Sequence, residues 1–186
     1  MQISVVIPTY NRADSLSVVL KSLLNQTFPA EEYELLLCDA GSTDGTEELV
    51  RELDDPRVVF TPGPNTGRSG ARNRGVREAR GDLILFTDAD IIAEPDLLQQ
   101  HFDFQSRYPG DAVVGCEVQV DTLEEYELYR QNPQSYARHS VSRKTVPWHY
   151  FLTGNASARK ADLLRVGVFD EEFTGYGHED LELGYR

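Results

Sequence analysis

The sequence of 186 residues lacks any hydrophobic run close to the roughly 20 residues that a membrane-spanning helix needs. Its longest apolar runs have the length of a β-strand, such as Val5-Val6-Ile7 and Leu83-Ile84-Leu85-Phe86. A membrane span is therefore not predicted, and peripheral association with a membrane is left open. Met1-Gln2 lead directly into a strand-like segment and leave no room for a secretory signal, so we expect a cytoplasmic protein.

Basic residues are also scarce, because 18 Lys and Arg face 31 Asp and Glu and leave a formal net charge of −13. Such an acidic chain lacks the positive surface that binds nucleic acid, so nucleic acid is not expected as a partner. Cys38 and Cys116 are the only cysteines, and both lie in apolar, strand-like segments without a paired motif. We expect both to be buried hydrophobic residues with no disulfide or metal.

The sequence does contain a regular alternation of short β-branched or leucine-rich segments with amphipathic segments of helix length. This alternation is typical of βαβ units, which form a mostly parallel sheet with helices on both faces. The length favours one domain, residues 1–186. The polar segment 121–147 is predicted to be a mobile insertion. The expected strands are residues 3–7, 33–38, 58–60, 82–86 (at the sheet centre) and 112–120. The expected helices are residues 14–25, 69–80, 96–108 and 159–166. Two further helices are expected, one that Asp44 caps with Glu47 as its capping-box partner and one that starts near His178.

Polar residues follow three of the first four expected strands, at the sheet edge where open α/β sheets bind ligands. After the fourth strand, Asp88 and Asp90 stand at positions i and i+2, so both carboxylates project from one side of an extended chain. Two such oxygen ligands would hold Mg²⁺ or Mn²⁺, with a diphosphate completing the coordination. The alternative is that one aspartate caps a helix or solvates the strand end.

A local excess of positive charge lies in the otherwise acidic chain. Arg68 and Arg72 stand one turn apart at the start of an expected helix, where the helix dipole also favours an anion. For Arg72 the sequence leaves open a phosphate contact or an ion pair with the aspartates. Arg77 and Arg80, at the far end of the helix, are expected to form a solvated basic face.

Carboxylates at two further places indicate a site. Asp39 follows the second expected strand and precedes a Gly-Ser-Thr turn, where it could accept a hydrogen bond from a nucleotide base or a ribose hydroxyl. Glu179 and Asp180 fall in the first turn of the last expected helix, where the dipole keeps a carboxylate ionised and able to accept a proton. An acidic mobile loop is the alternative there, and His178 is interpreted as a surface or supporting group.

Taken together, these segments resemble the inverting family 2 glycosyltransferases of GT-A fold. The resemblance rests on the order and spacing of several elements rather than on one motif. The similar elements are Ser4–Arg12, Asp39-Ala40-Gly41-Ser42-Thr43-Asp44-Gly45-Thr46, Asn65-Thr66-Gly67, Ala71-Arg72-Asn73-Arg74-Gly75, Thr87-Asp88-Ala89-Asp90, Gly154-Asn155-Ala156 with Val166–Glu171, and Gly177–Arg186.

The resemblance implies a Rossmann-like fold with a nucleotide-sugar-binding half at residues 1–95 and an acceptor-side half at 96–186, incomplete at its C-terminal end. It implies a nucleotide diphosphate sugar donor, usually of uridine, and a saccharide, lipid-linked or other hydroxyl acceptor. It further implies that Asp90, assisted by Asp88, binds Mn²⁺ or Mg²⁺ and that Asp180 is the catalytic base, with Glu179 orienting the acceptor. The expected substrate-binding residues are Pro8, Thr9, Tyr10, Arg12, Asp39, Gly67, Arg72, Asp88, Ala89, Gly154, Asn155 and Trp148, the last by stacking on an acceptor sugar.

Two other functions remain open on the sequence. A truncated or non-catalytic module would bind a nucleotide sugar without turnover. A sugar-nucleotide pyrophosphorylase would need a glycine-rich first loop with a lysine, and residues 8–12 have neither.

Overall fold

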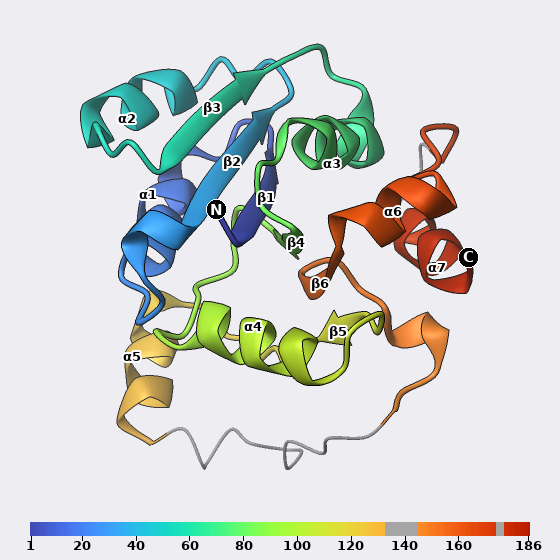
Figure 1. Ribbon diagram of the computed structural model, residues 1–186. Coiled ribbons are helices and arrows are strands. Elements are labelled where there is room, and N and C mark those ends of the chain that lie inside the picture. Colours follow the sequence, from blue (N-terminus) through green and yellow to red (C-terminus); the bar gives the residue numbers. More distant parts are fainter. Residues whose placement is uncertain (133–144, 174–176) are drawn as a thin grey trace.

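The computed structural model describes residues 1–132, 145–173 and 177–186, and within them the chain forms a six-stranded sheet of order β3-β2-β1-β4-β6-β5 (Figure 1). The first four strands are parallel, whereas β6 runs antiparallel to both of its neighbours. The predicted mostly parallel α/β fold is thus confirmed, and β4 lies inside the sheet as expected. The strands are β1 (Ile3–Thr9), β2 (Tyr33–Asp39), β3 (Val58–Pro62), β4 (Leu83–Thr87), β5 (Val113–Val114) and β6 (Asn155–Arg159).

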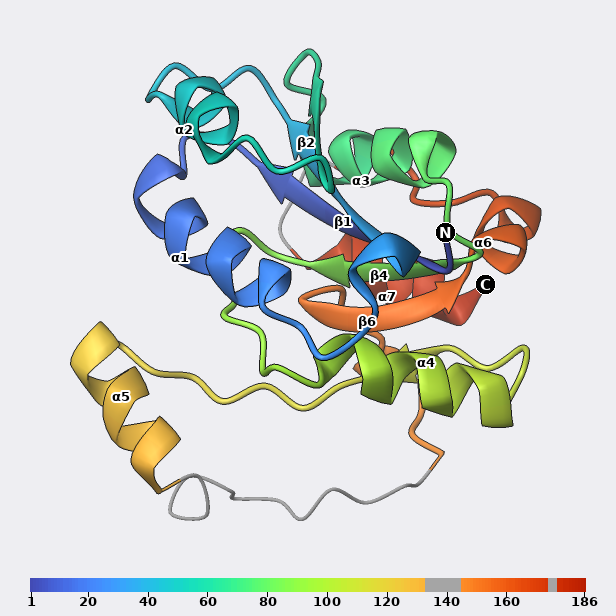
Figure 2. The same cartoon turned by 60° about the vertical axis from the view of Figure 1, so that its left-hand side comes forward.

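Helices cover both faces of the sheet because strand side chains alternate between them (Figures 1 and 2). Val5 of β1 points to a core shared with α1, α2 and α4, and its neighbour Val6 points to a core shared with α3, α6 and α7. No helix of the described ranges is long and apolar enough to cross a membrane. The helices are α1 (Ala13–Leu24), α2 (Thr46–Leu53), α3 (Gly67–Glu78), α4 (Leu97–Arg107), α5 (Leu123–Gln131), α6 (Lys160–Val166) and α7 (His178–Tyr185), with short 3₁₀ turns η1 (Ala30–Glu32) and η3 (Trp148–Tyr150).

A glycine allows α3 to lie directly on the sheet. A Cβ atom at Gly75 would come within 2.6 Å of Val6 Cγ1 and 2.7 Å of Cys38 Sγ. Such distances are too short for any residue with a side chain, so only glycine permits this approach. The close packing brings the middle of α3 to the end of β4.

The predicted strand at residues 112–120 is wrong over most of its length, because β5 contains only Val113 and Val114. After Gly115 donates its backbone N–H to Asn155 O at 2.8 Å, the chain leaves the sheet. Alternating valines alone do not make a strand without a partner to complete the hydrogen bonds. As a consequence Cys116 is exposed, contrary to prediction, whereas Cys38 is buried as expected.

Two elements of the second half were not predicted. β6 has the sequence Asn-Ala-Ser-Ala-Arg, whose small side chains carry no hydrophobic alternation. Helix α5 lies in the segment predicted to be a mobile insertion, and its start carries a capping signal: Thr122 Oγ1 accepts from the N–H of Glu125 at 3.1 Å. The rest of that predicted insertion includes residues 133–144, which lie outside the described residues.

Asp44 does not form the predicted capping box with Glu47. Helix α2 begins at Thr46 with Gly45 as its N-cap, so the expected pairing of Asp44 with Glu47 is wrong. Asp44 instead accepts hydrogen bonds from the Thr46 hydroxyl at 2.6 Å and from the N–H of Ala13 at 2.8 Å. The residue therefore ties the loop after β2 to the start of α1.

A buried carboxylate joins the end of α3 to β2. Glu34 is 1% exposed and accepts hydrogen bonds from the Ser4 hydroxyl at 2.6 Å, from the N–H of Arg80 at 2.7 Å and from the Arg80 guanidinium at 2.7 Å. Burial alone would raise the pKa of this carboxyl, but the hydrogen bonds from Ser4 and Arg80 outweigh it and lower the pKa below 4.5. Glu34 thus stabilises the fold in its ionised form.

We predict that Glu34→Gln destabilises the fold at pH 7 by about 1–3 kcal/mol, because the hydrogen bonds from Ser4 and Arg80 to an ionised carboxylate are lost. Water around the mostly exposed Arg80 screens its charge and limits this loss. Because the folded pKa is depressed, this stabilisation is present above the unfolded pKa and is lost as the pH falls through the folded pKa. The deficit should therefore shrink below pH 4. Urea unfolding of wild type and variant between pH 3 and 7 measures it. The exposed Glu31→Gln should match wild type throughout, and a deficit in Glu34→Gln that does not change with pH would contradict the account.

Candidate functional site

A hollow of about 280 Å³ lies where β1, β2 and β4 end. Parallel register places Thr9 beside Asp39, and the loop after β4 reaches the same edge. Polar side chains predicted at three separated places in the sequence therefore meet here. The lining residues are Pro8, Thr9, Tyr10, Arg12, Ala40, Asn65, Gly67, Arg68, Ala71, Asp88, Ala89 and Asp90.

Arg72 of α3 lies behind this hollow and is 1% exposed. Its Nη2 donates to Asp88 Oδ1 at 2.9 Å, and its Nη1 lies 3.4 Å from Asp180 Oδ1 and 3.5 Å from Glu179 Oε1. Its guanidinium carbon also lies 5.5 Å from the centre of the Phe169 ring. The sequence left open a phosphate contact or an ion pair with the aspartates for Arg72, and in the structure Arg72 forms the ion pair.

Asp88 and Asp90 differ in their surroundings. The side chain of Asp88 is 30% exposed, and burial raises its pKa more than the guanidinium of Arg72 lowers it, while the nearby charge of Asp90 raises it further. Asp90 is exposed in the same hollow. A cation between them would relieve this repulsion.

Asp180 lies in the first turn of α7, as predicted, and is 8% exposed. Its Oδ1 accepts a hydrogen bond from the hydroxyl of Thr153 at 2.6 Å, and its Oδ2 accepts from the N–H of Thr153 at 3.1 Å. The sequence offered no signal for Thr153, which is 27 residues away in the chain. The carboxylate is thus fixed from two sides, by Thr153 and by Arg72.

Glu179 faces Arg72 in this arrangement. It is 2% exposed, and its Oε1 points to Arg72. The acceptor-orienting role of Glu179 stays a prediction. The geometry gives Glu179 the role of supporting Arg72.

Glu117 was missed by the sequence analysis, since it falls in the segment 112–120 that was predicted to be a strand, whereas β5 ends at Val114. Burial raises its pKa, and the charges of Asp88, Asp90 and Asp180 raise it further. A Cβ atom at Gly154 would come within 2.6 Å of Glu117 Oε1. Gly154, predicted to bind substrate, thus gives room to the Glu117 carboxylate.

Asp39 is 3% exposed and is bound within its own turn. Its carboxylate accepts from the N–H groups of Gly41 and Ser42, both at 2.9 Å, and from the Ser42 hydroxyl at 2.5 Å. The neighbouring Ala40, rather than Asp39, lines the hollow. The contact of Asp39 with a nucleotide base stays a prediction.

The side chain of Asn155 is used inside the fold. Its Oδ1 lies 2.9 Å from His101 Nε2, and its amide donates to Cys116 O at 3.3 Å. Burial lowers the pKa of His101, which keeps this imidazole neutral near pH 7. The amide of Asn155 thus joins β6 to α4 and to the segment after β5, and its substrate contact stays a prediction.

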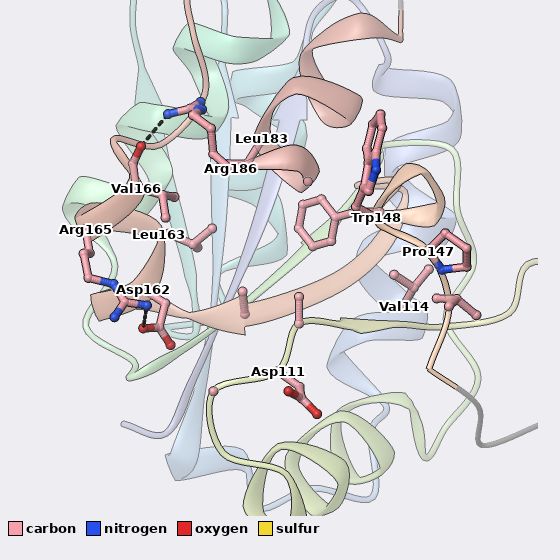
Figure 3. Close-up of a pocket in the computed structure, with 16 residues that line it drawn as sticks. Asp111, Val114, Pro147, Trp148, Asp162, Leu163, Arg165, Val166, Leu183 and Arg186 are labelled. Carbon is pink, nitrogen blue, oxygen red and sulfur yellow. Dashed lines mark hydrogen bonds and ion pairs between the residues drawn. The ribbon is translucent and has the colours of Figure 1, made fainter.

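Trp148 lies in a second hollow, of about 260 Å³, which shares no lining residue with the first (Figure 3). Its indole is half exposed and packs edge-on against Tyr185, with ring centres 5.4 Å apart. Leu163, Leu183 and Val114 supply apolar walls. The stacking of Trp148 on an acceptor sugar stays a prediction.

Two further sequence expectations agree with the structure. The side chains of Arg77, in the last turn of α3, and Arg80, two residues beyond it, are 59% and 60% exposed, and they pair with Glu171 and with the buried Glu34. His178 is exposed at the start of α7. Neither arginine lines the hollow at the sheet edge.

The donor set of the hollow suits a hard divalent cation that is shared with a substrate. Asp88 and Asp90 offer carboxylate oxygens, which Mg²⁺ and Mn²⁺ prefer. In the described ranges no group of three or more His, Cys, Asp and Glu side chains is placed to hold a metal ion. The protein alone would leave coordination positions open, and a diphosphate could fill them.

We predict that Arg72→Met lowers the free energy of unfolding at pH 7 by about 3–5 kcal/mol, because buried carboxylates lose their counter-charge. Arg77→Met, which removes an exposed guanidinium on the same helix, should cost under about 1 kcal/mol. Urea unfolding of both variants decides it. Equal losses would mean that the buried guanidinium contributes no more than a surface charge.

Comparison with known proteins supports the sequence resemblance. Residues 4–167 match the model of the glycosyl transferase family 2. The chain is 36% identical over 213 residues to a validoxylamine A glucosyltransferase of Streptomyces hygroscopicus subsp. jinggangensis, a match that covers 99% of this chain and 50% of that protein. It is 29% identical over 218 residues to a chondroitin synthase of Escherichia coli, covering 99% of this chain and 32% of that protein.

Solved structures of similar fold include S. aureus TarS residues 1–349 in complex with UDP, with a TM-score of 0.76 and 25% identity over 99% of this chain and 54% of that one. A mannosyltransferase of Pyrobaculum calidifontis, in complex with GDP-Man and Mn²⁺, has a TM-score of 0.71 and 24% identity over 98% of this chain and 50% of that one. The chain thus spans about half the length of its first relatives. It belongs to the glycosyl transferase family 2.

Proposed function

We propose that this chain transfers a sugar from a uridine diphosphate sugar to an acceptor hydroxyl, with inversion at the anomeric carbon. The observation that carries the proposal is that one guanidinium, of Arg72, contacts both Asp88 in the hollow and Asp180 beside it. Arg72 thereby holds Asp88, which would bind the donor, close to Asp180, which would act as the base. The complex of TarS with UDP supports uridine as the nucleotide.

The donor side is the hollow at the sheet edge. Pro8 and Thr9 at the end of β1, with Tyr10 and Arg12 after it, would surround the nucleoside. Asp39 would order the facing turn. Gly67 and Arg68 begin α3, where backbone N–H groups and the helix dipole favour the diphosphate. These residues would fix the sugar over the end of β4.

Asp90 and Asp88 would hold Mn²⁺ or Mg²⁺ against the diphosphate. When bound, such an ion supplies positive charge that stabilises the departing nucleoside diphosphate. The Mn²⁺ in the mannosyltransferase complex supports this choice of ion.

The acceptor side is the first turn of α7. Asp180 accepts the proton of the acceptor hydroxyl as that oxygen forms a bond to the anomeric carbon. The bond from this carbon to the β-phosphate oxygen breaks, and its electron pair leaves with the diphosphate. Attack from the face opposite the leaving group inverts the configuration. Arg72 and Thr153 keep Asp180 in place during this step.

We expect the purified protein to release UDP from at least one UDP-sugar with Mn²⁺, faster with a matching saccharide or lipid-linked acceptor, and not with EDTA. Asp90→Asn should remove the metal-dependent part of UDP binding, measured by calorimetry. Asp180→Asn should lower turnover roughly 10²–10⁴-fold with little change in UDP affinity.

The matched control is Asp82→Asn, an exposed acid that precedes β4 at the opposite end of that strand, which should behave as wild type. Metal-dependent UDP binding without any turnover would favour a non-catalytic nucleotide-sugar-binding module. Full turnover in Asp180→Asn would contradict the assignment of the base.

A further inference from the structure

Thr153 lies between η3 and β6, is 0% exposed, and makes two hydrogen bonds to one carboxylate. Its hydroxyl donates to Asp180 Oδ1 at 2.6 Å, and its N–H donates to Asp180 Oδ2 at 3.1 Å. A hydroxyl and an N–H of one residue thus bind both oxygens of the carboxylate. This two-point contact fixes the plane of the carboxylate as well as its position.

The two oxygens of Asp180 differ in the acceptor positions that they have left. A carboxylate oxygen has two lone pairs. Oδ1 accepts from Thr153 and lies 3.4 Å from Arg72 Nη1, whereas Oδ2 accepts only from the Thr153 N–H among the described residues. One acceptor position of Oδ2 is therefore left for a substrate.

Resting on the function proposed above, we propose that Thr153 is a positioning residue for the base and that Oδ2 of Asp180 takes the proton. The acceptor O–H bond breaks, its proton passes to Oδ2, and its oxygen bonds to the anomeric carbon. The bond from this carbon to the β-phosphate oxygen breaks at the same time, and its electron pair leaves with the diphosphate. Thr153 keeps its own hydroxyl proton, since it donates to Oδ1 throughout. The hydroxyl therefore directs the free lone pair without taking part in the transfer.

The segment that carries Thr153 is itself held against α7. A Cβ atom at Gly184 would come within 2.8 Å of Trp148 O and 2.9 Å of Phe151 Cβ, so the helix lies directly on η3. Phe151 is buried in the core formed by α3, α6 and α7. The carboxylate and its hydrogen-bond donors thus belong to two elements packed tightly together, which limits their relative movement.

The test compares Thr153→Val, which removes the hydroxyl but keeps the side-chain shape and the N–H, with Thr153→Ser, which keeps the hydroxyl. We expect Thr153→Val to lower kcat about ten- to a hundredfold, the effect of one hydrogen bond to a charged group, with donor KM and UDP affinity within about twofold of wild type. Thr153→Ser should recover kcat to within about threefold of wild type.

The matched control is Thr61→Val, at another buried threonine on β3, whose hydroxyl donates to Leu37 O of β2 at 3.2 Å. It should leave kcat unchanged. If Thr153→Val does not fold, Thr153→Cys replaces it. Its kcat should be lower than that of Thr153→Ser and of wild type, and higher than that of Asp180→Asn.

Three results would overturn the assignment: wild-type kcat in Thr153→Val or its cysteine substitute, a fall in UDP affinity equal to the fall in kcat, or a serine variant as slow as the valine variant. Each of these results concerns the role of Thr153 alone, because the proposed function is still supported as long as the wild-type protein transfers sugar. A wild-type protein that transfers no sugar to any acceptor would contradict both proposals.

Discussion

The buried guanidinium of Arg72 is the interaction on which the rest of this site depends. Asp88 comes from the end of β4, and Glu179 and Asp180 come from α7, almost a hundred residues later in the sequence. Enclosed carboxylates repel one another and lose hydration, so they can lie this close only around a positive charge. Arg72 supplies that charge, and it thereby joins the strand that would bind the donor to the helix that carries the base.

Several features that look separate in the sequence serve to place this guanidinium. Gly75 lets α3 approach β1 and β2 closely, and the side chain of Asn73 exchanges two hydrogen bonds of 2.9 Å with the backbone of Phe169, whose ring packs against Arg72. Before Phe169, Val168 has a φ of 58°, an unfavourable value for a β-branched residue. Arg186 donates to Val168 O at 2.6 Å and stabilises this backbone. Local strain is thus accepted where it positions the aromatic ring.

The sequence predicted the parts of the site that depend on local pattern. Apolar strands followed by polar residues located the sheet edge, the spacing of Asp88 and Asp90 located the paired carboxylates, and Asp180 was placed in the first turn of a helix. Contacts between distant segments could not be predicted in this way. Thr153 precedes β6, whose small residues carry no hydrophobic alternation, and Glu117 follows β5 in a segment whose pattern wrongly predicted a longer strand. The side chains of Glu179 and Asn155 turn inward because Arg72 and His101 bind them there.

The most direct test of this account is a crystal structure of the protein with UDP and Mn²⁺. Arg72 could serve the carboxylates, as here, or it could turn to the diphosphate, and these two arrangements differ in atoms that such a structure resolves. The account predicts that the diphosphate lies beside Asp90 and the start of α3 while Arg72 still contacts Asp88 and Asp180. A guanidinium bound to the diphosphate, with Asp180 released from it, would contradict the claim that Arg72 joins the donor side to the base.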